Sequence, residues 1–254
     1  MNRLKGKTAL ITGATSGIGK AIAEQLAVLE CNLIITGRRE NRLKEISDDL
    51  SNNYGIQVVT GVFDVRNTEA CKNFVSSLDQ EIDILVNNAG LAKGADPVQS
   101  ALLEDWDDMI DTNVKALLVF TRLVTPKMIA RNSGHIINIG SMAGHEAYPG
   151  GVGYCASKFA VKAITEATKK DLHGTKIRVS MVSPGLVETE FSNVRFKGDN
   201  DKADSVYQGI DPLTAADIAE IVVFMANRPQ HVNILDSIVM PVNQSSARMV
   251  HRDA

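Results

Sequence analysis

A short apolar strand pattern over residues 8–12 runs directly into a glycine-rich turn, residues 13–19, and then into a helical pattern over residues 20–30. Glycines at positions 13, 17 and 19 allow a tight turn and let the backbone approach a ligand closely. The helix that follows offers free N–H groups and a favourable dipole to an anion. The spacing is not the common G-x-G-x-x-G, but its place in a strand–turn–helix unit predicts a pyrophosphate site. This site comprises Gly13, Thr15, Ser16, Gly17, Ile18 and Gly19.

Strand and helix patterns alternate along the rest of the chain, and several strands are apolar throughout. The predicted strands are residues 8–12, 32–36, 58–63, 84–87, 135–139, 177–182 and 238–242. The predicted helices are residues 20–30, 40–50, 68–78, 104–131 with a bend at Pro126, one that carries Tyr154 and Lys158, and 217–227. Fully apolar strands indicate a parallel sheet that is covered on both faces. We therefore predict an α/β fold: one Rossmann-like domain over residues 1–254, a doubly wound parallel sheet with helices on both faces and its site at the carboxyl ends of the strands.

Charge and cysteine content exclude several classes of function. The 27 basic and 30 acidic residues are well mixed and give a net charge of −3, so nothing favours nucleic acid or an anionic membrane as a partner. Cys31, Cys71 and Cys155 have neither paired nor metal-ligand spacing. The first residues form no secretory signal, and the longest apolar runs are too short to cross a bilayer. We expect a soluble cytoplasmic protein without a bound metal.

The end of the second predicted strand bears on the choice of cofactor. An acidic residue there would hold the ribose hydroxyls of NAD, whereas an arginine would accept the 2′-phosphate of NADP. The chain has Arg38 and Arg39 after this strand, with no acid before them. Two guanidinium groups can grip a phosphate, so we predict NADP. The alternative is that both arginines are only the solvated start of a helix, a position where a cation is unfavourable.

The third and fourth strands also end in residues that suit a nucleotide. Asp64 and Val65 follow the third strand and are candidates for the adenine edge. Asn88, Ala89 and Gly90 follow the fourth, where small residues let the backbone pass a cofactor, although Asn and Gly also form ordinary turns.

Three residues in the second half of the chain suit proton transfer to or from an oxygen. Tyr154 and Lys158 are four residues apart, which places them on one face of a helix, and Ser141 follows a predicted strand. A nearby cation favours the phenolate and lowers a tyrosine pKa from about 10. The serine hydroxyl can hydrogen-bond a substrate oxygen. Tyr-x-x-x-Lys also occurs by chance in helices, so the pair gains weight from the predicted cofactor site beside it.

Taken together, these motifs resemble the short-chain dehydrogenase/reductase family, in the same order and over nearly the whole chain. They are Thr-Gly-x-x-x-Gly-x-Gly at 12–19, Asn-Asn-Ala-Gly at 87–90, Ser141, Tyr154 with Lys158, and Pro184-Gly185. The resemblance implies that Tyr154 is the acid–base residue, that Lys158 lowers its pKa and binds the nicotinamide ribose, and that Ser141 orients the substrate. It also implies that Asn113 completes a proton relay, and that Pro184, Gly185, Val187 and Thr189 lie at the cofactor.

Segments near the C-terminus are similar to a narrower group, the NADP-dependent 3-hydroxy acid dehydrogenases. They are residues 189–199, 228–234 and 240–245, with Met240-Pro241 where many short-chain enzymes carry Val-Asp-Gly-Gly. The resemblance implies hydride transfer between NADP(H) and a 3-hydroxy acid of the serine, allo-threonine or 3-hydroxypropionate type, or its 3-oxo counterpart, and a homotetramer. One alternative is a general carbonyl or 3-ketoacyl reductase of the same family. The other is a cofactor-sensing regulatory protein, disfavoured because Tyr154 and Lys158 are both present.

The polar segment 188–208 is predicted to be a mobile flap that closes on the substrate. A substrate carboxylate needs a cation, and the flap contains two candidates, Arg195 and Lys197. Either residue is equally well explained as an ordinary surface charge.

Overall fold

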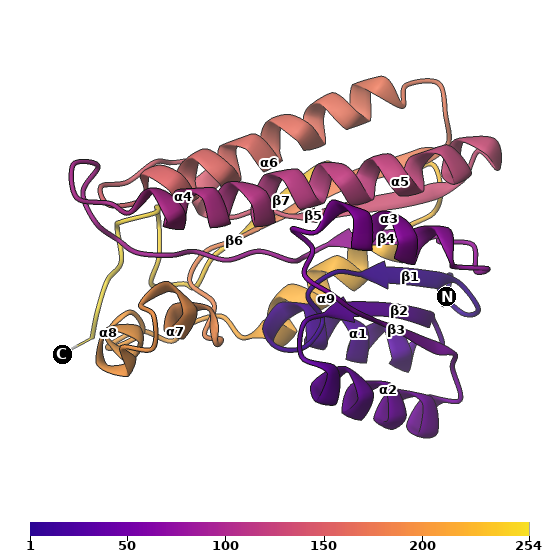
Figure 1. Cartoon of the computed structure of the whole chain (residues 1–254), viewed down its shortest axis with the longest axis horizontal. Coiled ribbons are helices and arrows are strands. Elements are labelled where there is room, and N and C mark those ends of the chain that lie inside the picture. The colour runs from indigo at the N-terminus through magenta and orange to yellow at the C-terminus, as the bar shows by residue number, and fades with distance from the viewer. Residues whose placement is uncertain (254) are drawn as a thin grey trace.

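A sheet of seven parallel strands forms the centre of the computed structural model, which describes residues 1–253 (Figure 1). The strand order is β3-β2-β1-β4-β5-β6-β7. The strands are β1 (Thr8–Ile11), β2 (Asn32–Gly37), β3 (Val58–Val62), β4 (Ile84–Asn87), β5 (Gly134–Ile139), β6 (Ile177–Pro184) and β7 (Asp236–Val239). The order reverses between β1 and β4, and ligands of doubly wound sheets bind at such a switch point. The predicted fold class is confirmed.

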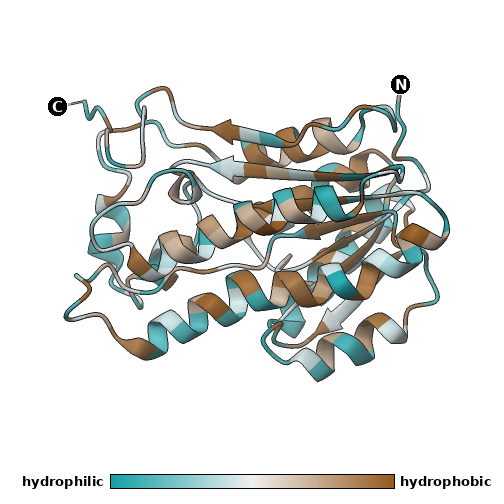
Figure 2. Cartoon of the chain, turned by 90° about the horizontal axis from the view of Figure 1, so that it is seen from above, coloured by the Kyte–Doolittle hydropathy of each residue, from teal (hydrophilic) through white to brown (hydrophobic). Residues whose placement is uncertain are grey.

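Helices cover both faces of the sheet. On one face lie α1 (Gly17–Val28), α2 (Glu40–Tyr54) and α9 (Ala215–Ala226). On the other lie α3 (Thr68–Ser76), α4 (Leu103–Ile110), α5 (Ala116–Ala130) and α6 (Val152–Asp171). Neighbouring strand residues serve opposite faces: Leu10 packs toward α3 and α5, and Ile11 toward α1 and α9. Figure 2 shows the result, with largely hydrophobic strands between helices that carry one apolar and one polar side.

The predicted long helix is three elements in succession. Between α4 and α5, residues Asp111–Lys115 form a π-helical turn, which contains Asn113. Pro126, where the sequence predicts a bend, lies inside α5. The π-helical turn comes before α5, at Asp111–Lys115. Single π turns of this kind occur often at functional sites.

The last strand lies earlier than predicted. It covers Asp236–Val239 rather than residues 238–242, because Asp236 pairs with Met181 and Val239 with Pro184. Pro241 has no N–H group to continue the ladder, and Val242 is fully exposed. The apolar run therefore continues past the end of the strand.

The segment 188–208, which the sequence predicts to be a mobile flap, has regular structure. It contains two short helices, α7 (Phe191–Arg195) and α8 (Asn200–Ser205), which lie together beside the carboxyl end of the sheet. The Asp199 side chain accepts a hydrogen bond from the Lys202 N–H at the start of α8. Within residues 1–253, no helix has the length and apolar character needed to cross a membrane.

One buried histidine predicts how stability depends on pH. His135 on β5 is 2 % exposed, and its Nε2 lies 2.8 Å from Ser180 Oγ. Burial, with Arg178 nearby, holds the pKa of His135 well below its ordinary value of 6.5. As pH falls below 6.5, His135 therefore becomes protonated in the unfolded chain but stays neutral in the folded chain. We expect unfolding free energy to fall by up to about 1.4 kcal/mol per pH unit there.

Urea denaturation between about pH 5 and pH 8 measures this slope. His135→Gln should flatten it, whereas His173→Gln, at an exposed position, is the matched control. Equal slopes in the two variants would contradict the prediction.

Candidate active site

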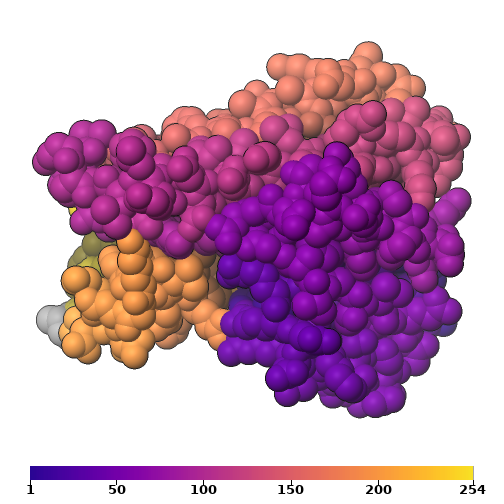
Figure 3. Space-filling model, in the orientation of Figure 1, coloured from indigo at the N-terminus to yellow at the C-terminus, as the bar shows by residue number. Residues whose placement is uncertain are grey.

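The carboxyl ends of the strands border one cleft of about 920 Å³. The predicted cofactor residues all line it: Gly13, Thr15, Ser16, Gly17, Ile18, Gly19, Arg38, Arg39, Asp64, Val65, Asn88, Ala89, Gly90, Tyr154, Lys158, Pro184, Gly185, Val187 and Thr189. Ser141 and Arg195 line it as well, whereas Asn113 and Lys197 do not. In Figure 3 the flap, in orange, lies beside the indigo and purple N-terminal half.

In the glycine turn, residues 13–19, the backbone lies too close to neighbouring backbone to leave room for a Cβ at two of the glycines. Gly13 has a φ of +70°, and a Cβ at this residue would lie 2.9 Å from the Cα of Ala89. A Cβ at Gly19 would lie 2.5 Å from the carbonyl oxygen of Gly13. Ser16 precedes α1 without capping it through its side chain, and the first turn of α1 holds no acidic residue. Uncapped N–H groups at a helix N-terminus fit a dinucleotide pyrophosphate.

The two arginines after β2 have different partners. Arg39 donates hydrogen bonds to Thr15 Oγ1, at 2.7 Å from Nη2, to Ser16 Oγ at 2.6 Å and to Glu190 at 2.8 Å. Arg38 is largely exposed, and its closest acidic partner is Asp64 at 3.7 Å. Sequence reasoning missed Arg42, one turn along α2, which donates to Glu190 at 2.7 Å. A helical i, i+3 spacing from Arg39 was the available signal.

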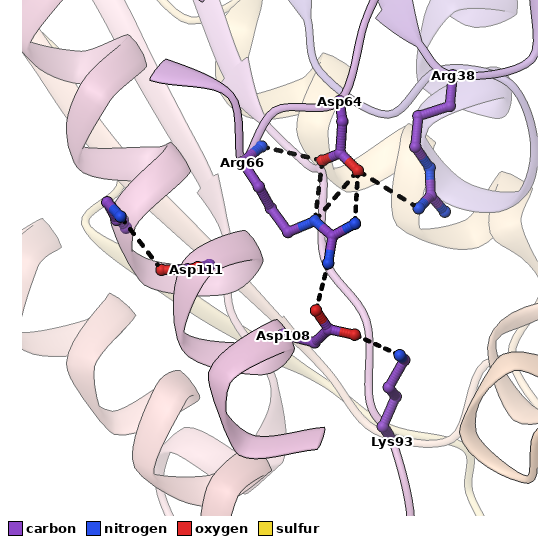
Figure 4. A network of polar contacts seen from close by, with 7 residues as sticks. Arg38, Asp64, Arg66, Lys93, Asp108 and Asp111 are labelled. Atoms are coloured by element: carbon purple, nitrogen blue, oxygen red, sulfur yellow. Dashed lines mark hydrogen bonds and ion pairs between the residues drawn. The ribbon is translucent and has the colours of Figure 1, made fainter. Parts of the chain in front are cut away.

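Asp64 belongs to a network of charges that ties the end of β3 to α4 (Figure 4). Its carboxylate accepts a hydrogen bond from Arg66 Nη2 at 2.7 Å, and Arg66 also bonds Asp108, which in turn bonds Lys93. Hydrogen bonds from Arg66 hold the pKa of Asp64 below its usual range. Asp64 lines the cleft, and Arg66 engages both of its carboxylate oxygens, so the predicted contact with adenine would share the carboxylate with Arg66.

The proposed proton-transfer residues meet at the other end of the cleft. Ser141 begins a 3₁₀ turn and accepts a hydrogen bond from the Ala143 N–H at 3.1 Å. Tyr154 and Lys158 lie one turn apart on α6, with Lys158 Nζ 5.8 Å from the centre of the Tyr154 ring. Lys158 Nζ donates to the Ile139 carbonyl at 2.9 Å. The strand end and the helix therefore bring all three together.

The pKa of Tyr154 differs from the expectation. Burial raises it well above 10, while a hydrogen bond with Ser141 and the charge of Arg195 oppose the rise. The predicted lowering by Lys158 does not appear in this structure: the groups that shift the Tyr154 pKa do not include Lys158, whose Nζ donates to the Ile139 carbonyl and lies 5.8 Å from the ring centre. Burial also lowers the pKa of Lys158 to about 8.

Asn113 lies behind the cleft, in the π-helical turn. Its Nδ2 donates to the Leu91 carbonyl at 2.8 Å and to Ser157 Oγ at 2.9 Å, and its Oδ1 accepts from the Leu91 N–H at 2.8 Å. The side chain thus links the segment after β4 to α6, next to Lys158. Both Nδ2 hydrogens are donated within the protein and Oδ1 accepts one hydrogen bond, so the structure gives Asn113 a positioning role, and its part in a proton relay stays a prediction.

The flap supplies the remaining wall. Phe191 packs edge-on against the Tyr154 ring, with centres 5.6 Å apart. The Arg195 guanidinium lies 5.7 Å from the rings of both Tyr148 and Tyr154, and donates to the Tyr148 hydroxyl at 3.0 Å. Lys197 instead pairs with Asp105 on α4 at 2.8 Å. Sequence reasoning missed Tyr148, which lies on a loop where spacing predicts no orientation.

The class that this fold and this cleft define is that of the dinucleotide-dependent oxidoreductases. The chain belongs to the short chain dehydrogenase family, whose profile matches residues 7–200.

Individual relatives match over nearly their whole length. The NADP-dependent 3-hydroxy acid dehydrogenase of Schizosaccharomyces pombe is 45% identical, with 99% of both chains covered. The NADP-dependent 3-hydroxy acid dehydrogenase YdfG of Escherichia coli K12 is 49% identical, over 96% of this chain and 98% of the relative. The closed form of serine dehydrogenase complexed with NADP⁺ superimposes with a TM-score of 0.91 at 47% identity, covering 97% of this chain and 100% of that one.

Proposed function

We propose that the protein is an NADP-dependent dehydrogenase that transfers a hydride between NADP(H) and a 3-hydroxy acid or its 3-oxo counterpart. Substrates of the serine, allo-threonine and 3-hydroxypropionate type fit this description. The observation that carries the proposal is Arg195, a cation 5.7 Å from the Tyr154 ring inside the cleft. A guanidinium at this distance can bind a carboxylate while the hydroxyl of the same small molecule lies at the phenol. The names of the relatives support the same substrate class.

The residues at the cleft divide the chemistry among them. When bound, NADP supplies the carbon that accepts the hydride from the carbinol carbon. Tyr154 takes the hydroxyl proton, and Ser141 hydrogen-bonds the same substrate oxygen. Lys158, with a pKa of about 8, is a cation at neutral pH and favours the phenolate of Tyr154 once its ammonium group faces the phenol oxygen. Asn113 holds the segment beside Lys158 in place.

Initial rates with NADP⁺ and NAD⁺ test this proposal against L-serine, L-allo-threonine, 3-hydroxypropionate and 2-propanol. Strong preference for NADP⁺ with activity on the acids supports it. Activity on 2-propanol alone would keep the family but assign the protein to the general carbonyl reductases.

Replacing the flap arginine separates binding of the carboxylate from the chemical step. We expect Arg195→Gln to raise KM for L-serine about tenfold or more, because a charge-assisted hydrogen bond contributes about 1.5–3 kcal/mol. Lys197→Gln, which removes the same charge from the same flap, should change KM far less, since Lys197 faces Asp105. Steady-state kinetics of both variants measure the difference. An equal rise in KM for 2-propanol would contradict a role for Arg195 in carboxylate binding.

We further propose a cytoplasmic homotetramer in which each chain is a single NADP-binding unit. The support is the family resemblance together with exposed apolar side chains on α5, α6 and β7, among them Leu118, Phe159 and Ile238. Sedimentation velocity measures the assembly, and a monomer at micromolar concentration would overturn it.

A further inference from the structure

The carboxylate of Glu190, at the start of the flap helix α7, is held by two arginines of the N-terminal half. Its Oε2 accepts from Arg39 Nη1 at 2.8 Å and its Oε1 from Arg42 Nη1 at 2.7 Å. The same Arg39 donates to Thr15 and Ser16 in the glycine turn. Hydrogen bonds from Arg39 and Arg42 lower the pKa of Glu190 to about 2. The Glu190 carboxylate is therefore the anion that pairs with Arg39 and Arg42 beside the glycine turn.

The place of these arginines suits a phosphate better than a surface ion pair. Arg39 precedes α2 directly and Arg42 lies in its first turn, where the helix dipole repels cations unless an anion is present. Both follow the carboxyl end of β2, where the adenosine ribose of a dinucleotide is bound in sheets of this kind. The ribose of NADP carries a 2′-phosphate there, and that of NAD carries a hydroxyl.

The guanidinium groups that a phosphate would bind here already donate hydrogen bonds within the protein. The Nε, Nη1 and Nη2 atoms of Arg39 all have partners, and the Arg42 hydrogen bond goes to Glu190. Carboxylate and phosphate compete for the same guanidinium forks. Arg38 stands apart, because it is largely exposed with only Asp64 at 3.7 Å.

We propose that Glu190 occupies the 2′-phosphate site as an internal counter-ion that the phosphate displaces, and that Arg42 is a further arginine of that site, deciding between NADP and NAD. This inference rests on the proposed binding of NADP. Because Glu190 immediately precedes α7, its release also frees the flap that carries Phe191 and Arg195 to the substrate end. Binding at the phosphate end is thereby coupled to the flap.

Titration calorimetry of NADP⁺ and NAD⁺ tests both parts. Glu190→Gln should lower the Kd of NADP⁺ about three- to tenfold, as expected when two partly exposed ion pairs no longer compete, and should change the Kd of NAD⁺ by less than about twofold. Glu188→Gln, the same change two residues away, is the control for long-range charge. Arg42→Ala should raise the Kd of NADP⁺ about tenfold while sparing NAD⁺. Lys44→Ala, which removes a charge elsewhere on α2, is its control.

Trypsin cleavage after Lys197 and Lys202 in the flap reports displacement directly. The ligand 2′,5′-ADP carries the 2′-phosphate without the nicotinamide, so it should speed cleavage of the native chain, whereas 5′-AMP should not. In the Glu190→Gln variant cleavage should be fast from the outset and indifferent to both ligands.

Two results would overturn the inference: Glu190→Gln and Glu188→Gln shifting NADP⁺ affinity equally, or 2′,5′-ADP and 5′-AMP changing flap cleavage equally. A native chain that binds NAD⁺ as tightly as NADP⁺ would instead overturn the proposed cofactor. The two failures are thus distinguishable.

Discussion

Replacing Tyr154 by phenylalanine is expected to lower kcat by about 10²–10⁴-fold, because general acid–base catalysis supplies a factor of that size. The ring and its edge-on contact with Phe191 stay in place, so only the phenol oxygen is lost. Cofactor affinity should therefore stay within about threefold of the native value, since no hydrogen bond to the pyrophosphate end is removed. Steady-state rates and calorimetry with NADPH measure the two effects separately.

A matched control is Tyr54→Phe, which removes a hydroxyl from an exposed tyrosine at the end of α2. It should leave kcat unchanged. A Tyr154→Phe variant with native kcat would remove Tyr154 from the acid–base role and leave the proposed mechanism without a proton acceptor.

The raised pKa of Tyr154 also sets the sign of the pH dependence. In the free enzyme the phenol is protonated at neutral pH, because burial disfavours the phenolate. Oxidation of an alcohol needs the phenolate, so kcat/KM for oxidation should increase with pH above neutrality. The increase should lessen once pH passes the Lys158 pKa of about 8, because the cation that favours the phenolate is then lost. Reduction of the 3-oxo acid needs the phenol and should decrease over the same range. The tyrosine limb should be missing from the residual rates of Tyr154→Phe.

The strand-end residues were predictable from the sequence because the carboxyl ends of parallel strands meet at one edge. Arg38, Asp64, Asn88 and Ser141 each follow a separate apolar run, and all four line the same cleft. Local periodicity identifies the apolar runs as strands. Because these strands are parallel in a doubly wound sheet, the residues that follow them all lie at the same edge.

Contacts between distant segments were not predictable in the same way. Glu190 and Arg42 are 148 positions apart, and no local pattern joins them. Nor does residue type separate Arg195 from Lys197, because the difference is that Asp105 on α4 lies beside only one of them. Both pairs depend on how the flap packs over the sheet.

Backbone geometry that depends on packing could not be predicted from the sequence either. Nothing in the residue types of Asp111–Lys115 distinguishes a π-helical turn from α-helix. The side chain of Asn113 holds this turn through its hydrogen bonds to Leu91 and Ser157. Hydrophobic period cannot resolve a single turn of this kind. The position of β7 follows likewise from its pairing with β6, not from where its apolar residues end.

Replacing Gly13 by alanine is expected to lower the free energy of unfolding by about 2–5 kcal/mol and to weaken NADP binding at least about tenfold. Two terms add. The φ of +70° costs an L side chain about 1–2 kcal/mol. The new Cβ would also lie 2.9 Å from the Cα of Ala89 and 3.3 Å from its N, so the backbone must move, and overpacking costs about 1–3 kcal/mol more. Because this movement occurs in the turn predicted to contact the pyrophosphate, the affinity for NADP should fall together with the stability of the fold.

Gly55→Ala separates these two terms. Gly55 ends α2 with a φ of +65°, and a Cβ there would meet nothing within 4 Å. It should therefore lose only the backbone term, about 1–2 kcal/mol, and bind NADP normally. Denaturation curves and calorimetry on both variants give the crowding term by difference. Equal losses of stability, with NADP affinity intact in Gly13→Ala, would mean that the turn can move away from Ala89 freely. The glycine would then be needed for its backbone conformation alone, not for the close approach of the β1 and β4 ends on which the cofactor site depends.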